Sequence, residues 1–266
     1  IANILNNNGS TVVNIAKKNN YWENLQKYLP DVEEVYWAGG EPLITNEHYK
    51  ILDNWIDTGK TDVRLRYTTN FSNMRYKSKS IYSYWEQFDD VQVSASLDAN
   101  GPRAEFMRHG TNWQQIEQNR IEMLERVPHV HFEITPTISL YNVWNFPDFH
   151  IDWVERGLVD IDKCRLNVLT GPDFMRIDYI PEKYKRELRA KYIDYKKWAY
   201  EKCDSEDMVR EVLGHIDSVL QFMNMGKYNQ EKLNQFFKKN HTLDVHRKED
   251  FWAVFPELGW LREHIT

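Results

Sequence analysis

Residues 35–43 read Val35-Tyr36-Trp37-Ala38-Gly39-Gly40-Glu41-Pro42-Leu43. A short run of β-branched and aromatic residues is followed here by two glycines, an acid and a proline. Glycine at the carboxyl end of a strand lets the backbone take a positive φ or approach a ligand closely. Glu41 then offers acceptors for a cation such as an ammonium group. A tight turn without a ligand is the other interpretation of the same residues.

Strands and helices are predicted to alternate on both sides of this stretch. Runs rich in Val, Ile, Tyr and Thr predict strands at residues 34–38, 63–69, 91–97, 130–138 and 163–169. Amphipathic stretches predict helices at residues 21–29, 46–58, 73–88, 111–127 and 145–156. This order is typical of βαβ units with a parallel sheet. Residues 1–20 supply only a weak strand at 11–15, so we expect the first unit to be cut through and the chain to be a fragment.

The predicted strands have one apolar and one polar face. In residues 91–98, Val91 and Val93 alternate with polar side chains, which are Gln92, Ser94, Ser96 and Asp98. Similar polar sets occur in residues 64–70, 131–138 and 164–169. An open doubly wound sheet shares this element order, but strands buried on both faces usually read as continuous apolar runs. The pattern therefore favours a barrel whose lumen is lined by polar side chains. These side chains either bind a ligand or form an internal network in which Arg and Glu side chains pair with one another.

The second part of the chain has a different pattern. Helices are predicted at residues 181–203, 205–226 and 229–240, followed by an irregular aromatic tail. A boundary is placed near Gly171-Pro172. The predicted fold class is α/β, a partial parallel (β/α)6-type, TIM-like barrel over residues 1–172 with its first unit truncated. Residues 173–266 form a mostly helical C-terminal extension.

Composition excludes several classes of partner. Aromatic residues make up 14% of the chain, enough for a sizeable core, and 34 basic against 40 acidic residues give a net charge of −6. A negative chain is a poor match for nucleic acid or an anionic membrane. No apolar run approaches the roughly 20 residues that span a bilayer, so we expect a cytoplasmic protein. Its two cysteines, Cys164 and Cys203, match no metal-ligand or disulfide spacing and predict buried or half-buried thiols.

The stretch Gly39-Gly40-Glu41-Pro42 resembles the motif with which radical S-adenosylmethionine (SAM) enzymes hold the amino group of SAM. The resemblance covers residues 20–175 and includes matches at the ends of later strands. These are Tyr67-Thr68-Thr69-Asn70, Ser94-Ala95-Ser96-Leu97-Asp98, Arg108-His109-Gly110, Thr135-Pro136-Thr137 and Leu166-Asn167-Val168. Weaker likeness to phage and bacterial members with twitch or SPASM-type domains lies at Ile180-Pro181, Asp244, Arg247 and Phe255-Pro256-Glu257-Leu258.

The resemblance implies a SAM site whose residues are Gly39, Gly40, Glu41, Pro42, Thr69, Asn70, Ser94, Ser96, Asp98, Arg108, Thr137, Asn167 and Val168. Glu41 and the glycine backbone would take the ammonium group. Arg108 would pair with the methionine carboxylate, Ser96 and Asp98 would reach the ribose, and Asn167-Val168 would contact the adenine. No catalytic residue is assigned.

The family also implies a [4Fe-4S] cluster on a Cys-x3-Cys-x2-Cys segment, which this chain lacks. We therefore expect no metal ligands in this chain and place the cluster segment upstream of Ile1. The full-length protein would then generate a 5′-deoxyadenosyl radical. It would act on a peptide or protein substrate with the help of an electron donor.

Three other interpretations remain. In the first, a barrel without a cluster binds SAM or a partner without redox chemistry. His129-Val130-His131 has the His-x-His form of metallohydrolases, although it lies at the start of a strand. Glu41 and Asp98 would suit the carboxylate pair of a glycosidase.

Overall fold

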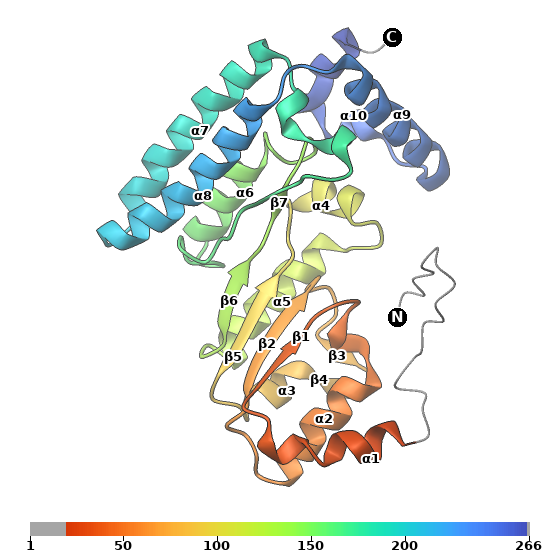
Figure 1. Cartoon of the computed structure of the whole chain (residues 1–266), viewed down its shortest axis with the longest axis vertical. Helices are drawn as coiled ribbons and strands as arrows, with labels where there is room; N and C mark the ends of the chain where they lie inside the picture. The colour runs from red at the N-terminus through yellow and green to blue at the C-terminus, as the bar shows by residue number, and fades with distance from the viewer. Residues whose placement is uncertain (1–19, 265–266) are drawn as a thin grey trace. The chain divides into compact units, whose positions relative to one another are not determined.

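The computed structural model describes residues 20–264, a mixed α/β protein with a parallel sheet of four strands (Figure 1). The weak strand predicted at 11–15 lies outside the described residues. Two units divide the described chain. Residues 20–95 and 122–131 form the first, and residues 96–121 and 132–264 form the second.

Three parallel strands build the first unit: β1 (Glu34–Trp37), β2 (Arg64–Thr69) and β5 (Val91–Ala95). Trp37, Tyr67 and Val93 share one level of the register. The strand order of the whole sheet is β1-β2-β5-β6, with β6 at His131–Ile134. The predicted parallel sheet is therefore confirmed.

One face of these strands is apolar and carries the core of the first unit. Leu65, Tyr67 and Val93 are buried, and the Tyr67 ring lies 5.4 Å from that of Trp85. The helices α2 (Asn46–Asp57) and α3 (Ile81–Trp85) lie beside the sheet (Figure 1). Both bury most of their aromatic residues, and burial of this apolar surface stabilises the unit.

The charged residues of the polar strand faces pair with one another. Arg66 donates two hydrogen bonds to Asp90, at 2.6 and 2.9 Å, and Glu34 lies 3.5 Å from its Nε. In the second unit, Arg165 Nε lies 2.7 Å from the buried carboxylate of Glu133. These pairs offset part of the charge of the polar faces, and an internal Arg–Glu network in a barrel lumen stays a prediction.

The predicted helix at 73–88 is mostly wrong. A two-stranded antiparallel hairpin, β3 (Arg75–Tyr76) and β4 (Lys79–Ser80), precedes the short α3. Lys77 lies in the turn with φ of 55°, a left-handed conformation that a right-handed helix cannot contain. The helix predicted at 21–29 is also shorter. It forms as α1 (Tyr21–Gln26), followed by a 3-10 turn at Leu29–Asp31.

The second unit contains a parallel pair, β7 (Thr137–Ile138) and β8 (Asn167–Val168), and a parallel bridge between Ile134 and Cys164. The strand predicted at 130–138 is thus divided into β6 and β7. Pro136 lies at the break, where it has no N–H to donate, although its carbonyl still accepts from Asn167 N at 2.9 Å.

Helices make up the rest of the second unit. They are α4 (Gly101–Met107), α5 (Trp113–Arg126, which ends in the first unit), α6 (Phe146–Glu155), α7 (Glu182–Lys202), α8 (Glu206–Met225), α9 (Gln230–Arg247) and α10 (Phe251–Val254). Short 3-10 segments lie at Asp173–Met175, Ile177–Tyr179 and Pro256–Glu263. The helices predicted at 145–156, 181–203 and 205–226 are confirmed. The prediction missed α4, ended α9 too early at 240, and wrongly treated the tail as irregular.

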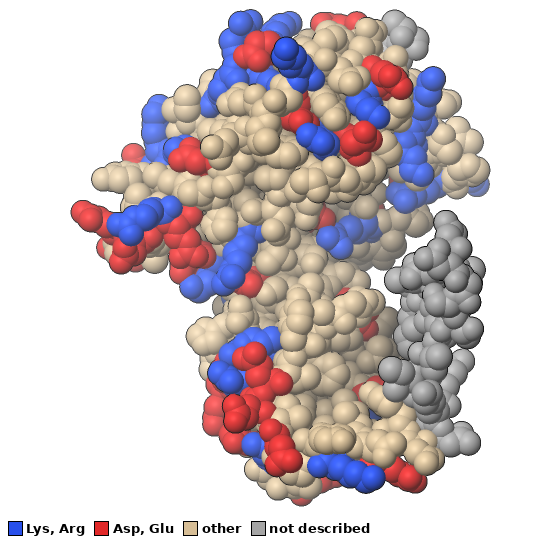
Figure 2. All heavy atoms as spheres, in the orientation of Figure 1, with Lys and Arg blue, Asp and Glu red and all other residues tan. Residues whose placement is uncertain are grey.

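The α7 and α8 helices lie side by side (Figure 1), and Lys196 on α7 bonds Asp217 on α8 at 2.6 Å. Lysine and arginine side chains lie among acidic ones on the face drawn in Figure 2. Among residues 20–264, no helix is both long enough and apolar enough to cross a membrane.

Candidate functional site

The Gly-Gly-Glu-Pro stretch forms an open turn at the carboxyl end of β1. Gly39 and Gly40 are exposed and have φ of +79° and +61°, values that other residues rarely adopt. A Cβ atom at either position would meet no atom within 4 Å among the described residues. Glycine is therefore required by the backbone conformation, and the space beside the turn is open to a ligand.

Glu41 joins this turn to the end of the neighbouring strand. Its Oε1 accepts a hydrogen bond from Thr69 Oγ1 at 2.7 Å, and its Oε2 accepts one from Asn70 N at 2.9 Å. Leu43 N gives a longer contact to Oε1, 3.4 Å. A carboxylate has about four acceptor positions, so these three donors leave room for about one more. The structure thus brings together two motifs that lie 28 residues apart.

Local hydrogen bonds fix the orientation of the Thr69 hydroxyl. Thr69 Oγ1 accepts from Phe71 N at 3.0 Å, so its own proton is directed to Glu41. Asn70 Oδ1 accepts from Ser72 N at 2.9 Å, which makes a side-chain turn after the strand. These bonds hold the backbone N–H of Asn70 toward the Glu41 carboxylate.

Pro42 positions Glu41 from the other side. It is buried and opens the 3-10 segment Pro42–Ile44, where its lack of an N–H costs nothing. The carbonyl of Leu43 accepts from the buried Tyr49 hydroxyl at 3.0 Å, which attaches the segment to α2.

A buried histidine lies in the core of the first unit. His48 on α2 is fully buried, its Nε2 lies 2.9 Å from the Tyr67 hydroxyl, and its ring lies 4.7 Å from that of Trp37. Burial lowers the pKa of His48 to about 3, so the ring is neutral at pH 7. The sequence prediction did not single out His48, although its place on the apolar face of a predicted helix was a signal.

Ser94 lies on the polar face of β5, opposite Thr68 in the register. Thr68 Oγ1 lies 2.8 Å from the Tyr36 hydroxyl. Uncharged hydroxyl groups therefore occupy this part of the polar face.

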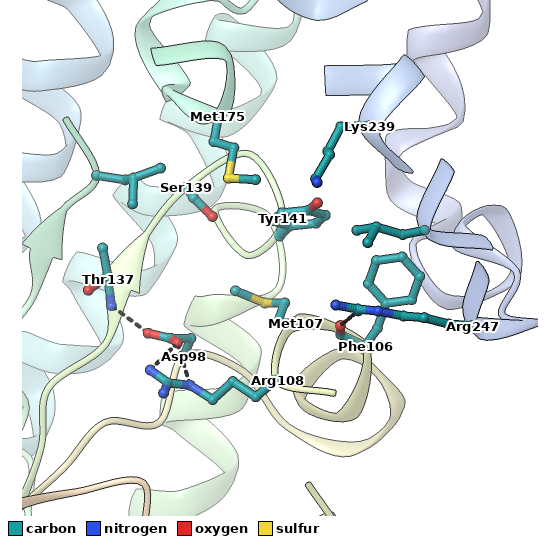
Figure 3. A pocket seen from close by; sticks show the side chains of 12 residues that line it. Asp98, Phe106, Met107, Arg108, Thr137, Ser139, Tyr141, Met175, Lys239 and Arg247 are labelled. Atoms are coloured by element: carbon teal, nitrogen blue, oxygen red, sulfur yellow. Dashed lines mark hydrogen bonds and ion pairs between the residues drawn. The ribbon is translucent and has the colours of Figure 1, made fainter. Parts of the chain in front are cut away.

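In the second unit, Asp98 and Arg108 bind each other. Asp98 Oδ2 accepts from Arg108 Nε at 2.9 Å and Nη2 at 2.7 Å, while Oδ1 accepts from Thr137 N at 2.8 Å (Figure 3). From the sequence, Asp98 was predicted to contact the ribose of SAM and Arg108 its carboxylate. In the structure the two side chains form an ion pair with each other. Both donors share one carboxylate oxygen, and the contact is a charge-assisted hydrogen bond.

Asn142 is a positioning residue that sequence reasoning missed. Its buried Nδ2 donates to Asp98 O at 2.7 Å and Thr137 O at 3.1 Å, and its Oδ1 accepts from Ser139 N at 2.8 Å. A polar residue in an otherwise apolar stretch, 140–143, was the available signal.

The other residues predicted for the SAM site in the second unit are Ser96, Asn167 and Val168. Ser96 is half-buried at the start of the second unit. Asn167, which is exposed, pairs with Thr137 in the β7–β8 register, and the half-buried Val168 follows it. Asp98, Arg108 and Thr137 line one side of a cavity of about 450 Å³.

The structure offers little support for a metal site at His129-Val130-His131 or for a glycosidase pair at Glu41 and Asp98. His129 Nε2 contacts the carbonyls of Trp85 and Phe88, at 3.1 and 3.2 Å. Within residues 20–264, no three His, Cys, Asp or Glu side chains group as a metal site. Glu41 and Asp98 each accept hydrogen bonds from donors of their own unit, so the glycosidase pair stays a prediction.

Both cysteines are free, as predicted. Cys164 is buried and Cys203 is half-buried. Burial raises the pKa of the Cys164 thiol, which disfavours the thiolate that metals bind. Two such thiols do not fit the three-cysteine ligation of a [4Fe-4S] cluster.

No protein-family model matches the sequence. A search of the curated proteins finds no match either.

Proposed function

We propose that this chain binds SAM and that Glu41 holds the ammonium group of the ligand. The observation that carries the proposal is the contact of Glu41 with Thr69 and Asn70 at adjacent strand ends. Ligands of parallel α/β sheets bind at the carboxyl ends of strands, and Glu41 lies at such an end. It has acceptor capacity left, and the two glycines beside it leave open space.

Charge complementarity supports an ammonium ligand at this turn. Two neutral donors, the Thr69 hydroxyl and the Asn70 amide, orient the carboxylate without neutralising its charge. A cation that adds a charge-assisted hydrogen bond to such a preoriented carboxylate binds more tightly than a neutral donor. The amino group of SAM is such a cation.

The finer fold proposal is a partial parallel (β/α) barrel of the radical SAM kind. Its support is the apolar and polar faces of β1, β2 and β5, together with the parallel β7–β8 pair in the second unit. The assignments of Ser96, Asp98, Arg108, Thr137, Asn167 and Val168 to other parts of SAM belong to this proposal. A peptide substrate and an electron donor belong to it as well.

A second candidate is SAM binding without redox chemistry. The observation in its favour is that the whole sequence holds two cysteines, 39 residues apart, where a cluster needs three close together. Radical chemistry would therefore need cluster ligands that this sequence does not contain. The binding proposal for Glu41 is the same in both cases.

Calorimetric titration tests the proposal with two matched ligands. SAM carries the methionine ammonium and carboxylate, whereas 5′-methylthioadenosine keeps the adenosine and lacks both. We expect SAM to bind at least about tenfold more tightly, the value of one charge-assisted hydrogen bond. Absence of SAM binding up to about 1 mM, or equal affinity for both ligands, would contradict the proposal.

Three variants extend this titration. Arg108→Ala and Ser96→Ala test the second-unit assignments, and we expect each to weaken SAM binding about tenfold. Arg186→Ala in α7 removes a positive charge away from the predicted site residues and should leave the affinity unchanged. Unchanged affinity in both the Arg108 and Ser96 variants would overturn those assignments while leaving the Glu41 proposal intact.

A further inference from the structure

The second unit holds a cavity whose α9 side was not part of the predicted SAM site, whereas Asp98, Arg108 and Thr137 on its wall were. Its volume is about 450 Å³, within the range of small-molecule sites. Lys239, Leu243 and Arg247 line it from α9, one helical turn apart at spacings of four residues. Figure 3 shows the Lys239 and Arg247 side chains extending from α9 toward Tyr141 and Phe106.

The charge of the cavity wall is positive. Its basic residues are Arg108, Lys239 and Arg247 and its one acid is Asp98, so three minus one gives +2. Asp98 is already paired with Arg108. The excess positive charge therefore lies on the α9 side.

Lys239 and Arg247 differ in the interactions that their charged groups form with other residues of the chain. The Arg247 Nη1 donates to Phe106 O at 3.1 Å and lies 3.6 Å from Glu249 Oε2, so part of its charge is offset. Lys239 is exposed at the cavity wall and forms no ion pair with any residue in the range 20–264. An ammonium with three donors is therefore open to an anion.

Much of the remaining wall is apolar, beside the hydroxyl residues Thr137 and Ser139. Half of the lining residues are aromatic, aliphatic or thioether side chains, and these are Phe106, Met107, Tyr141, Leu169, Met175 and Leu243. The Tyr141 hydroxyl is occupied by Asn240, at 2.8 Å, so Tyr141 offers mainly its ring. Such a wall favours a ligand with a flat or hydrocarbon body.

We propose that this cavity binds a small organic anion whose apolar body lies against the apolar wall that includes Phe106 and Tyr141 and whose acid group pairs with Lys239 and Arg247. The proposal goes beyond SAM binding and does not depend on it. It names an amphipathic acid rather than inorganic phosphate, because apolar walls add nothing to the affinity for phosphate.

The test uses N-acetyl-L-tryptophan, which carries a carboxylate, and its neutral amide, titrated by ligand-observed NMR. We expect the acid to bind at least about tenfold more tightly than the amide. Lys239→Met should remove most of that difference. Lys238→Met, which changes the next residue on α9 and not the cavity wall, should leave it unchanged.

Four results would overturn the proposal. They are equal binding of acid and amide, an equal loss in the Lys238 variant, no binding of the acid up to about 10 mM, and displacement by inorganic phosphate at equal concentration. The affinity of Glu41→Gln for N-acetyl-L-tryptophan separates the two proposals. Glu41 does not line the cavity, so we expect this affinity to be unchanged while SAM binding is weakened.

Discussion

The Thr69 hydroxyl lies 2.7 Å from Glu41 Oε1 and accepts a hydrogen bond from Phe71 N at 3.0 Å. One buried oxygen thus serves both the candidate site and the tight backbone after β2, where Phe71 has φ of 58°. Because of these two roles, we expect a substitution at Thr69 to change the free energy of unfolding as well as the affinity for SAM.

We expect Thr69→Val to lower the free energy of unfolding by about 1–3 kcal/mol, because it removes the hydroxyl that accepts from Phe71 N and donates to Glu41, at nearly unchanged side-chain volume. Urea denaturation measures this change. Thr69→Ser keeps the hydroxyl and should retain most of the hydrogen bonding. Equal stability of the Val variant and the original chain would contradict the described hydrogen bonds.

The glycine turn allows a test of backbone strain. Gly40→Ala places a Cβ at φ of +61° with no steric neighbour, so its cost of about 1 kcal/mol comes from the backbone alone. Gly214, in the middle of α8, also has open space, and Gly214→Ala should stabilise the protein by up to about 1 kcal/mol. Thermal or urea unfolding should show opposite signs, and a destabilising Gly214→Ala would be inconsistent with α8.

The Asp98–Arg108 ion pair can be measured by a double-mutant cycle with Asp98→Asn and Arg108→Met. The Arg108 side chain is 38% exposed and that of Asp98 is 11% exposed, so water screens part of the attraction. We expect a coupling energy of about 1 kcal/mol that falls at high salt. A coupling near zero at low salt would show that the pair does not hold the two residues together.

Buried histidines predict a loss of stability in acid. Burial lowers the pKa of His48 to about 3 and that of His150 to about 4, while the unfolded chain titrates near 6.5. Between these values the unfolded state binds more protons, so the free energy of unfolding falls as the pH drops below 6.5. At pH 5 each histidine accounts for up to about 2 kcal/mol.

His48→Gln and His150→Gln should each reduce the difference in unfolding free energy between pH 7 and pH 5. Denaturant titrations at the two pH values measure it. An unchanged difference in both variants would mean that neither ring is buried in its neutral form.

The sequence predicted those parts of the fold that depend on local periodicity. The alternation of Leu65, Tyr67, Val91 and Val93 indicated β2 and β5, and helical spacing indicated α7 and α8. The hairpin at Arg75–Ser80 was missed because a left-handed Lys77 leaves no signal in hydrophobic spacing. Pro136, which was within a predicted strand, was the available warning that this strand would divide.

The candidate site was predictable only where its residues lie at strand ends. Glu41 and Thr69 follow neighbouring parallel strands, so their meeting could be expected. Asn142 acts through backbone carbonyls, and nothing in the sequence indicates which carbonyls it reaches. The common helix face of Lys239, Leu243 and Arg247 was missed because α9 was predicted to end at 240, before Leu243 and Arg247.

The most direct test of SAM binding at Glu41 is the affinity of Glu41→Gln for SAM and for 5′-methylthioadenosine, measured by calorimetry on a variant whose folding is verified by urea denaturation. Because only SAM has the ammonium group, the account predicts a loss of roughly ten- to hundredfold in SAM affinity. It also predicts an unchanged affinity for 5′-methylthioadenosine. Unchanged SAM affinity, or an equal loss for both ligands, would contradict the account.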